Sequence, residues 1–251
     1  MTQNPVRVLE IRHAESEPPG AYGPALDEIA DVTTLRIWRE PVPADLGDVD
    51  AIIVLGGAMG VDDAERIPWI SEEIALLKRA VEAGIPVWGV CLGAQMLTKA
   101  LGGEVYTGPS PELGVHPVSF TDAGLADPVW GPALDAAGQG HEMTTVHWHF
   151  DTCRLPAGAE LLASSEQCNT QLYRKDNCYG VQFHLEAGAA LVSDWLSHPE
   201  SRADVVEVLG ETATRRFADD AGAVEGATAP LAHAVMGRWL AEVVAADRDT
   251  R

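Results

Sequence analysis

The stretch IPVWGVCLGAQMLTKALGG, residues 85–103, starts as an apolar run, breaks at residues 89–93 and continues with the pattern of a helix. The break reads Gly-Val-Cys-Leu-Gly, which places Cys91 between two glycines. This order is typical of the sharp turn that joins a buried strand to a helix and lifts a nucleophile above a sheet. Glycine has no side chain to clash where the backbone folds back. The stretch therefore predicts a strand, a catalytic cysteine and a helix in an α/β protein.

The position of Cys91 also favours a reactive thiol. A helix is expected to begin just after it, and the free N–H groups of a helix N-terminus favour a thiolate and can hold an oxyanion. The alternative is a buried cysteine that packs as a small apolar residue. The two glycines, the strand before them and the helix after them favour catalysis.

The first hundred residues alternate between strand-like and helix-like patterns. We expect strands over 6–13, 33–40, 51–57 and 85–90, and helices over 24–32 and 66–84. Such alternation predicts an open, doubly wound, mostly parallel sheet flanked by helices. Sites in these sheets form at the carboxyl ends of strands, where LGGAMG (55–60) and GVCLGAQ (89–95) both lie.

After residue 103 the pattern changes to short, turn-punctuated β segments, expected as an antiparallel extension that ends near residue 186. Residues 190–251 are rich in alanine and helical in period, with interruptions expected at 197–204 and 218–230. Their apolar positions suit a helix packed on the sheet or on a second subunit, compatible with a homodimer; examples are Val235, Trp239, Leu240 and Val243. We expect one domain over residues 1–251, with a core over about 5–195 and a C-terminal helical extension over 196–251.

Composition narrows the class of protein. The chain has 251 residues, 46% of them hydrophobic and 22% charged, as in ordinary globular proteins. Seventeen basic and 38 acidic residues give a net charge of −21, which disfavours nucleic acid and anionic membranes as partners. The sequence contains no long apolar run and begins without a secretion signal, so we expect a cytoplasmic protein.

The four cysteines form no Cys-x-x-Cys pair, and nothing in the sequence indicates secretion. Neither a zinc site nor a disulfide framework is indicated. We expect no metal and no cofactor.

A nucleophilic cysteine needs a base, which is usually distant in sequence but near in space. The segment YGVQFHLE, residues 179–186, is a late β segment that ends with His184 and Glu186. Residues two apart on a strand point to the same side, so Glu186 could orient the His184 imidazole toward the thiol. An isolated His-x-Glu would more often be a solvated strand end. Together with Cys91 it predicts a Cys-His-Glu triad.

Three motifs, GGAMG (56–60), GVCLGAQ (89–95) and VQFHLE (181–186), occur in this order. The combination resembles the class I, triad-type glutamine amidotransferases over roughly residues 45–190. The stretch HWHFDTCRLPAGAELLASS, residues 147–165, is similar to the corresponding part of stand-alone members that resemble the amidotransferase domain of GMP synthase. The resemblance implies a flavodoxin-like class I amidotransferase fold.

The same resemblance implies roles for the matched residues. Cys91 would attack the side-chain amide of glutamine, form a γ-glutamyl thioester and release ammonia. His184 would be the base and then the acid, and Glu186 would orient it. The backbone N–H groups of Leu92 and Gly57 would form the oxyanion hole.

Two further residues are expected to bind the substrate glutamine by the same resemblance. Gln95 lies one helical turn beyond Cys91, and it could instead be an ordinary exposed helix residue with no role in binding. His149 would hold the α-amino and α-carboxylate groups, and its alternative is a structural role. The chain departs from the family pattern at Leu185 and in GGAMG, where proline is common in the family. Neither departure removes a reacting group.

We expect a glutaminase that delivers ammonia to a separate synthetase, because the chain has no Walker-type motif for ATP-dependent acceptor chemistry. An alternative is a γ-glutamyl peptidase that acts on small γ-glutamyl peptides or conjugates by the same thioester chemistry. Another alternative, of a different class, is a non-catalytic binding or regulatory module on the same fold.

Overall fold

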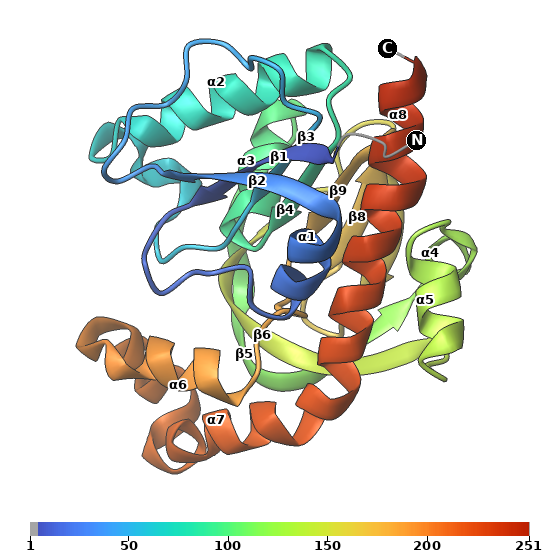
Figure 1. The fold of residues 1–251 in the computed structure, drawn as a ribbon. Helices are drawn as coiled ribbons and strands as arrows, with labels where there is room; N and C mark the ends of the chain where they lie inside the picture. Colours follow the sequence, from blue (N-terminus) through green and yellow to red (C-terminus); the bar gives the residue numbers. More distant parts are fainter. Residues whose placement is uncertain (1–4, 251) are drawn as a thin grey trace.

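The computed structural model describes residues 5–250 and shows a mixed sheet with helices on both faces (Figure 1). Within these residues the sheet has nine strands in the order β2-β1-β3-β4-β9-β8-β7-β5-β6. Their bounds are β1 (Val6–Arg12), β2 (Ala30–Arg36), β3 (Ala51–Val54), β4 (Val87–Val90), β5 (Val105–Phe120), β6 (Glu142–Cys153), β7 (Glu160–Ser164), β8 (Leu172–Lys175) and β9 (Cys178–Val181).

The five strands β2, β1, β3, β4 and β9 are parallel, and β9, β8, β7, β5 and β6 pair antiparallel. Every residue of β3 and β4 is buried, as expected for parallel strands that helices cover on both faces. The predicted doubly wound sheet with an antiparallel extension is therefore confirmed. The carboxyl ends of β1, β3 and β4 meet at one edge, where the candidate site lies.

The helices form a layer on each face of the sheet (Figure 1). Helices α2 and α3 cover one face, and α1, α5 and the later part of α7 cover the other. Their bounds are α1 (Gly23–Ile29), α2 (Trp69–Glu82), α3 (Leu92–Ala100), α4 (Asp122–Ala126), α5 (Trp130–Ala136), α6 (Ala189–Ser197), α7 (Pro199–Arg238) and α8 (Ala245–Thr250), with short turns η1 (Gly20–Tyr22), η2 (Val61–Glu65) and η3 (Trp239–Val244).

Aromatic packing fixes the C-terminal helices on the sheet. The Trp88 ring in β4 stacks on Tyr179 with centroids 5.4 Å apart and on Trp130 with centroids 6.0 Å apart. Trp239 packs on the same ring at 5.6 Å. Of the apolar positions singled out in the sequence, Val235, Trp239 and Leu240 are buried in the core, and Val243 packs against it. The C-terminal segment thus packs on the sheet of its own chain.

Strand β2 begins at Ala30, inside the helix expected over 24–32, because the chain pairs with β1 from that residue on. The structure also corrects two larger parts of the predicted secondary structure. The β-like pattern expected after residue 103 includes residues 114–124, but α4 begins at residue 122 and α5 follows it. Both helices have local caps: Thr121 Oγ1 accepts from the Gly124 N–H at 3.0 Å, and Asp127 Oδ1 accepts from the Trp130 N–H at 3.0 Å. Such caps supply partners for free N–H groups at a helix start.

The second correction concerns the C-terminal helix. The sequence predicts an interruption over 218–230, but α7 runs through it despite Gly222, Gly226 and Pro230. One side of this stretch is buried in the core, so packing outweighs the low helix propensity of these residues. The one non-helical residue inside α7 is Gly210, with φ of +76°. Helix α6 ends at Ser197 and α7 begins at Pro199, close to the other expected interruption.

No helix within residues 5–250 combines the length and apolar character required to cross a bilayer.

Candidate active site

Cys91 lies at the turn from β4 to α3 in a strained conformation, with φ of +50° and ψ of −108°. Its N–H donates to the Val181 carbonyl at 2.7 Å, which ties the turn to β9. A Cβ on Gly93 would overlap the Val54 carbonyl, and one on Gly89 would lie 2.5 Å from the Gly93 carbonyl. The glycines are therefore required for α3 to pack closely on β3 and β4. Strain of this kind is common at catalytic positions.

His184 lies opposite Cys91 in the same cavity, and its Nδ1–H donates to Glu186 Oε1 at 2.7 Å. Both side chains are buried. The Trp195 ring packs edge-on against the imidazole with centroids 4.9 Å apart. Burial alone would lower the pKa of His184, but Glu186 and the adjacent Cys91 outweigh it and raise that pKa well above its usual value. The structure brings the three residues of the predicted triad together, while their catalytic roles stay predictions.

The two predicted oxyanion donors are also adjacent. Leu92 begins α3, so its N–H is one of the free donors of that helix. A Cβ on Gly57 would lie 2.9 Å from Leu92 Cδ2 and 2.9 Å from His13 Cβ, so the backbone at Gly57 approaches the start of α3 closely. Gly57 and Cys91 line the same cavity, and Leu92 follows Cys91 directly, while the role of the two N–H groups stays a prediction.

His13, at the end of β1, holds the glycine turn in place and was not predicted from the sequence. Its Nδ1–H donates to the Gly56 carbonyl at 2.8 Å, and its Nε2–H donates to Glu73 Oε2 at 3.0 Å. Burial would lower the pKa of His13, but the buried Glu73 carboxylate outweighs it and raises that pKa. The Gly56 carbonyl and the Gly57 N–H belong to one trans peptide and point in opposite directions. By holding the carbonyl, His13 fixes the direction of the N–H.

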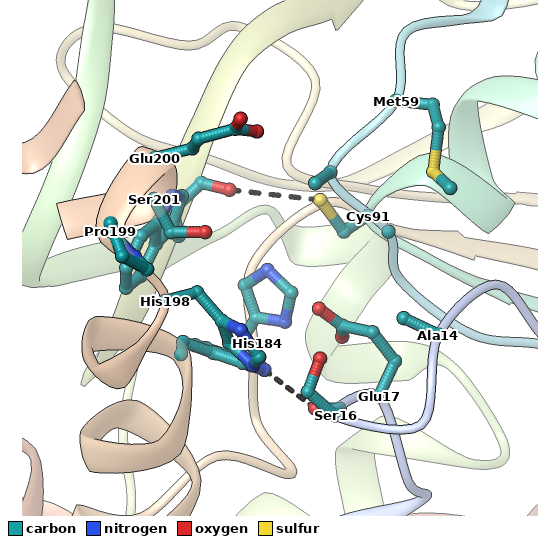
Figure 2. A pocket seen from close by; sticks show the side chains of 14 residues that line it. Ala14, Ser16, Glu17, Met59, Cys91, His184, His198, Pro199, Glu200 and Ser201 are labelled. Atoms are coloured by element: carbon teal, nitrogen blue, oxygen red, sulfur yellow. Dashed lines mark hydrogen bonds between the residues drawn. The ribbon is translucent and has the colours of Figure 1, made fainter. Parts of the chain in front are cut away.

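The site opens into a cavity of about 460 Å³ (Figure 2). One side, which we call the elbow wall, consists of residues 57–59 and Cys91. The other side, which we call the outer wall, consists of the loop residues 14, 16 and 17 with Trp195 and residues 198–201. His184 and Trp148 complete the lining. The volume is within the usual range for small-molecule sites.

Two hydrogen bonds in Figure 2 connect these parts. The Cys91 thiol donates to the Trp148 carbonyl at 3.7 Å, which places the β6 backbone beside the sulfur. The Trp195 indole N–H donates to the Ser16 carbonyl at 2.9 Å and so holds the loop after β1 against α6. Residues 198–201 of the C-terminal extension also line the cavity, which the sequence did not indicate.

Glu17 is the second site residue that sequence reasoning missed. It is partly exposed, and its side chain points into the cavity toward Cys91 and His184 (Figure 2). Burial of the carboxylate raises the pKa of Glu17 to about 7; the nearby His184 works against the rise and Glu186 adds to it. A carboxyl group with such a pKa beside a cysteine and a histidine is a candidate functional group.

The two predicted substrate contacts lie behind the cavity wall. Gln95 is buried, and its amide donates to the Asp151 carbonyl and to Gln182 Oε1, each at 3.4 Å. His149 is buried too, and its Nδ1–H donates to the same Asp151 carbonyl at 3.1 Å. Neither residue lines the cavity in this structure. Their predicted contact with glutamine stays a prediction.

A buried group of metal-ligand type lies further along β6. Ligand atoms of Glu112, His147 and His149 lie within 4.8 Å of one another, a set that could hold a divalent cation by residue type. The Gln171 amide nitrogen donates to Glu112 Oε2 at 2.5 Å and lies 3.3 Å from His147 Nδ1. Burial lowers the pKa of His147 to about 3. The group forms a hydrogen-bonded network that supports the strand behind the cavity.

The other three cysteines differ from Cys91 in their surroundings. All four cysteines are buried and free, but Cys153, Cys168 and Cys178 do not line the cavity. Burial raises the pKa of Cys153 to about 11 and that of Cys178 to about 12, and it also raises the pKa of Cys168. They are poor candidates for a nucleophile because the thiolate is the reactive form.

Comparison with known families gives a match over most of the chain. The model of the family described as Glutamine amidotransferase class-I matches residues 28–191. A glutamine amidotransferase-like protein of Salmonella typhimurium is 31% identical over 220 residues, which are 85% of this chain and 89% of that protein. One of the subunits of the glutamine-hydrolyzing GMP synthase of Sulfolobus acidocaldarius is 30% identical over 145 residues, which are 57% of this chain and 70% of that protein.

Solved structures give the same result. A glutamine amidotransferase from Thermotoga maritima has a TM-score of 0.80 and 27% sequence identity, with 95% of this chain and 99% of that chain covered. A glutamine amidotransferase from Methylobacillus flagellatus has a TM-score of 0.77 and 29% identity, with 95% of each chain covered.

Proposed function

The chain belongs to the class-I glutamine amidotransferases, and we propose that it hydrolyses the side-chain amide of glutamine through Cys91, His184 and Glu186. One observation carries the proposal. Cys91, in a strained turn at the start of α3, shares a cavity with His184, whose other ring nitrogen is held by Glu186. Nucleophile, base and orienting group in this relation are the requirements of acyl transfer.

In the first half of the reaction the Cys91 sulfur attacks the γ-carbonyl carbon of glutamine. The thiol proton goes to His184, and the carbonyl oxygen becomes an oxyanion held by the N–H groups of Leu92 and Gly57. His184 then protonates the nitrogen as the C–N bond breaks. Ammonia leaves and a γ-glutamyl thioester remains on Cys91.

In the second half a water molecule attacks the thioester carbon while His184 takes one of its protons. The C–S bond breaks, the Cys91 sulfur regains a proton from His184, and glutamate leaves. Glu186 accepts the Nδ1–H of His184 throughout, so Nε2 faces the reacting atoms and the imidazolium is stabilised. The raised pKa of His184 is in keeping with this role.

For Gln95 and His149 we propose a contribution through the backbone. Both donate to the Asp151 carbonyl, in the strand whose Trp148 carbonyl lies next to the Cys91 sulfur. They thus hold the side of the cavity where the glutamyl part of the substrate would lie.

We also propose that the ammonia serves a synthetase on a separate chain. The name of the Sulfolobus relative, which is one component of a GMP synthase, supports such an arrangement. The net charge of −21 would favour a partner with a basic surface. We propose that residues 5–250 act as one unit, because the C-terminal helices complete both the core and the cavity.

The test is to label the purified protein with a glutamine-analogue diazoketone and map the modified peptides by mass spectrometry, while assaying glutamate release from glutamine. We expect glutamine hydrolysis, and modification of Cys91 alone, because the other three thiols lie outside the cavity and have raised pKa values. Equal labelling of all four cysteines, or cleavage of γ-glutamyl peptides with negligible glutaminase activity, would contradict the proposal.

A further inference from the structure

Glu17 lies where the amine part of the substrate must leave. A Cβ on Gly56 would be 3.1 Å from Glu17 Oε2 and 3.4 Å from His184 Cε1, so both side chains converge on that glycine. Since His184 is the group that protonates the departing nitrogen, the amine lies next to His184 during cleavage. Whatever is attached to that nitrogen therefore passes Glu17.

The carboxylates along this exit are not matched by a lysine or an arginine. Glu17 lies inside the cavity, and the exposed Glu200 lies in the first turn of α7 at its outer wall (Figure 2). Among residues 5–250, no lysine or arginine lines the cavity. The remaining titratable groups of the lining are Cys91, His184 and His198. An anionic leaving group would meet two carboxylates and no permanent cation.

Glu17 also has no structural task that explains a carboxylate at this place. The described residues provide no hydrogen bond or ion pair to its side chain, whereas Glu15 in the same loop pairs with Arg39 at 3.6 Å. Keeping an acid in a cavity without a partner costs stability, and such a cost is typical of groups retained for function.

We propose that Glu17, assisted by Glu200, makes the cavity selective for γ-glutamyl amides whose amine part is uncharged or cationic, against γ-glutamyl peptides, whose amine part carries a carboxylate. This inference rests on the proposed function, of which it defines the substrate class. The cavity of about 460 Å³ extends past the triad to α7, which leaves room for an amine larger than ammonia. Charge complementarity then decides which amine is accepted.

Three γ-glutamyl amides of nearly equal size test the proposal: the ethylamide, the 2-aminoethylamide and γ-glutamylglycine. Their amine parts are neutral, cationic and anionic. For the wild-type protein at pH 8 we expect kcat/KM for the cation to exceed that for the anion by about tenfold or more, with the neutral compound between them. In Glu17→Gln we expect this ratio to fall at least fivefold, and in Glu200→Gln to fall less because Glu200 is exposed.

The matched control is Glu15→Gln, which removes the same charge from an exposed side chain of the same loop and should leave the ratio unchanged. If Glu17→Gln slows all three substrates equally, Glu17 acts through His184 and the selectivity proposal is wrong. A wild-type preference for γ-glutamylglycine, or hydrolysis of glutamine with no turnover of any larger amide, also overturns it. No turnover of glutamine and no labelling of Cys91 would instead overturn the proposed function.

Discussion

The elbow wall and the outer wall of the cavity are built in different ways. The elbow wall follows buried strands of the parallel sheet, and close glycine contacts and the strained turn at Cys91 fix its backbone. The outer wall depends on side chains from a loop and two helices, and several of them, such as His198 and Glu200, are exposed.

This difference separates the chemical reaction from the choice of substrate. Backbone N–H groups and a thiol on rigid strand ends can act on any γ-glutamyl amide, because every such substrate presents the same carbonyl group. Side chains on helices can differ in charge without disturbing that machinery. Variants of the elbow wall should therefore slow all substrates alike, and variants of the outer wall should change which substrate is chosen or how stable the protein is.

The largest effect is expected for Cys91→Ala. Without the nucleophile no thioester forms, so kcat for glutamine should fall by about 10³-fold or more while the protein stays folded. Glutamate release and thermal unfolding measure the two properties. The matched control is Cys153→Ala, a buried thiol outside the cavity, which should keep its activity and lose some stability. If the activity of Cys91→Ala were within tenfold of the wild type, Cys91 would not be the nucleophile.

A smaller effect is expected for His13, which acts on the elbow wall through the Gly56 carbonyl. Loss of an oxyanion donor costs about 10²–10³ in kcat in other enzymes, and a donor that is only misdirected should cost less, about 10- to 100-fold. We expect His13→Ala to lower kcat with little change in KM, because the donor acts on the oxyanion.

The conservative variant separates positioning from folding at this site. His13→Asn keeps an N–H donor within reach of the Gly56 carbonyl and should recover part of kcat, although both variants lose the ion pair with Glu73 and some stability. Steady-state kinetics and thermal unfolding of both variants provide the comparison. Equal kcat in the two variants would mean that His13 supports the fold alone.

The elbow wall could be predicted because its constraints are local in sequence. Gly89, Cys91 and Gly93 are adjacent, and strand and helix patterns flank them. His13 and Glu17 were missed although His13 ends a predicted strand and Glu17 lies in the loop after it, at the edge where sites form, which is a usable signal. The surroundings of these two side chains come from residues about 40 to 170 positions away, such as Gly56 and His184.

The outer wall and part of the fold could not be predicted, because they too depend on contacts between residues far apart in the sequence. Helix α7 continues across glycines and a proline because its buried face packs on the sheet, and only the assembled core supplies that packing. Helices α4 and α5 are short, and their signal is a cap at Thr121 and at Asp127 within a stretch of β-like pattern. Local propensity is a weak guide where tertiary contacts decide.

The smallest effect concerns the stability of the outer wall and follows from the pKa of Glu17. This pKa is about 7 in the folded protein and 4.5 for an ordinary glutamate, chiefly because of burial. The folded state thus binds the Glu17 proton more tightly than the unfolded state does. The bound proton stabilises the fold below pH 4.5, and this contribution is lost as pH rises through 7. The charged groups that act on Glu17 are His184, Glu186, His13 and Asp194.

Glu17→Gln removes the titrating group and should therefore stabilise the protein at pH 8 but not at pH 4.5. Because Glu17 is partly exposed, solvent reduces the gain to about 1 kcal/mol, which corresponds to about 2–4 °C in Tm for a chain of this length. Thermal unfolding of wild type, Glu17→Gln and Glu15→Gln between pH 4.5 and pH 8 measures this gain in Tm. A gain in Tm that is the same at both pH values would show that burial does not raise the pKa of Glu17. A gain at pH 8 alone would mean that the outer wall retains a carboxylate at the expense of stability, as expected if its charge selects the substrate.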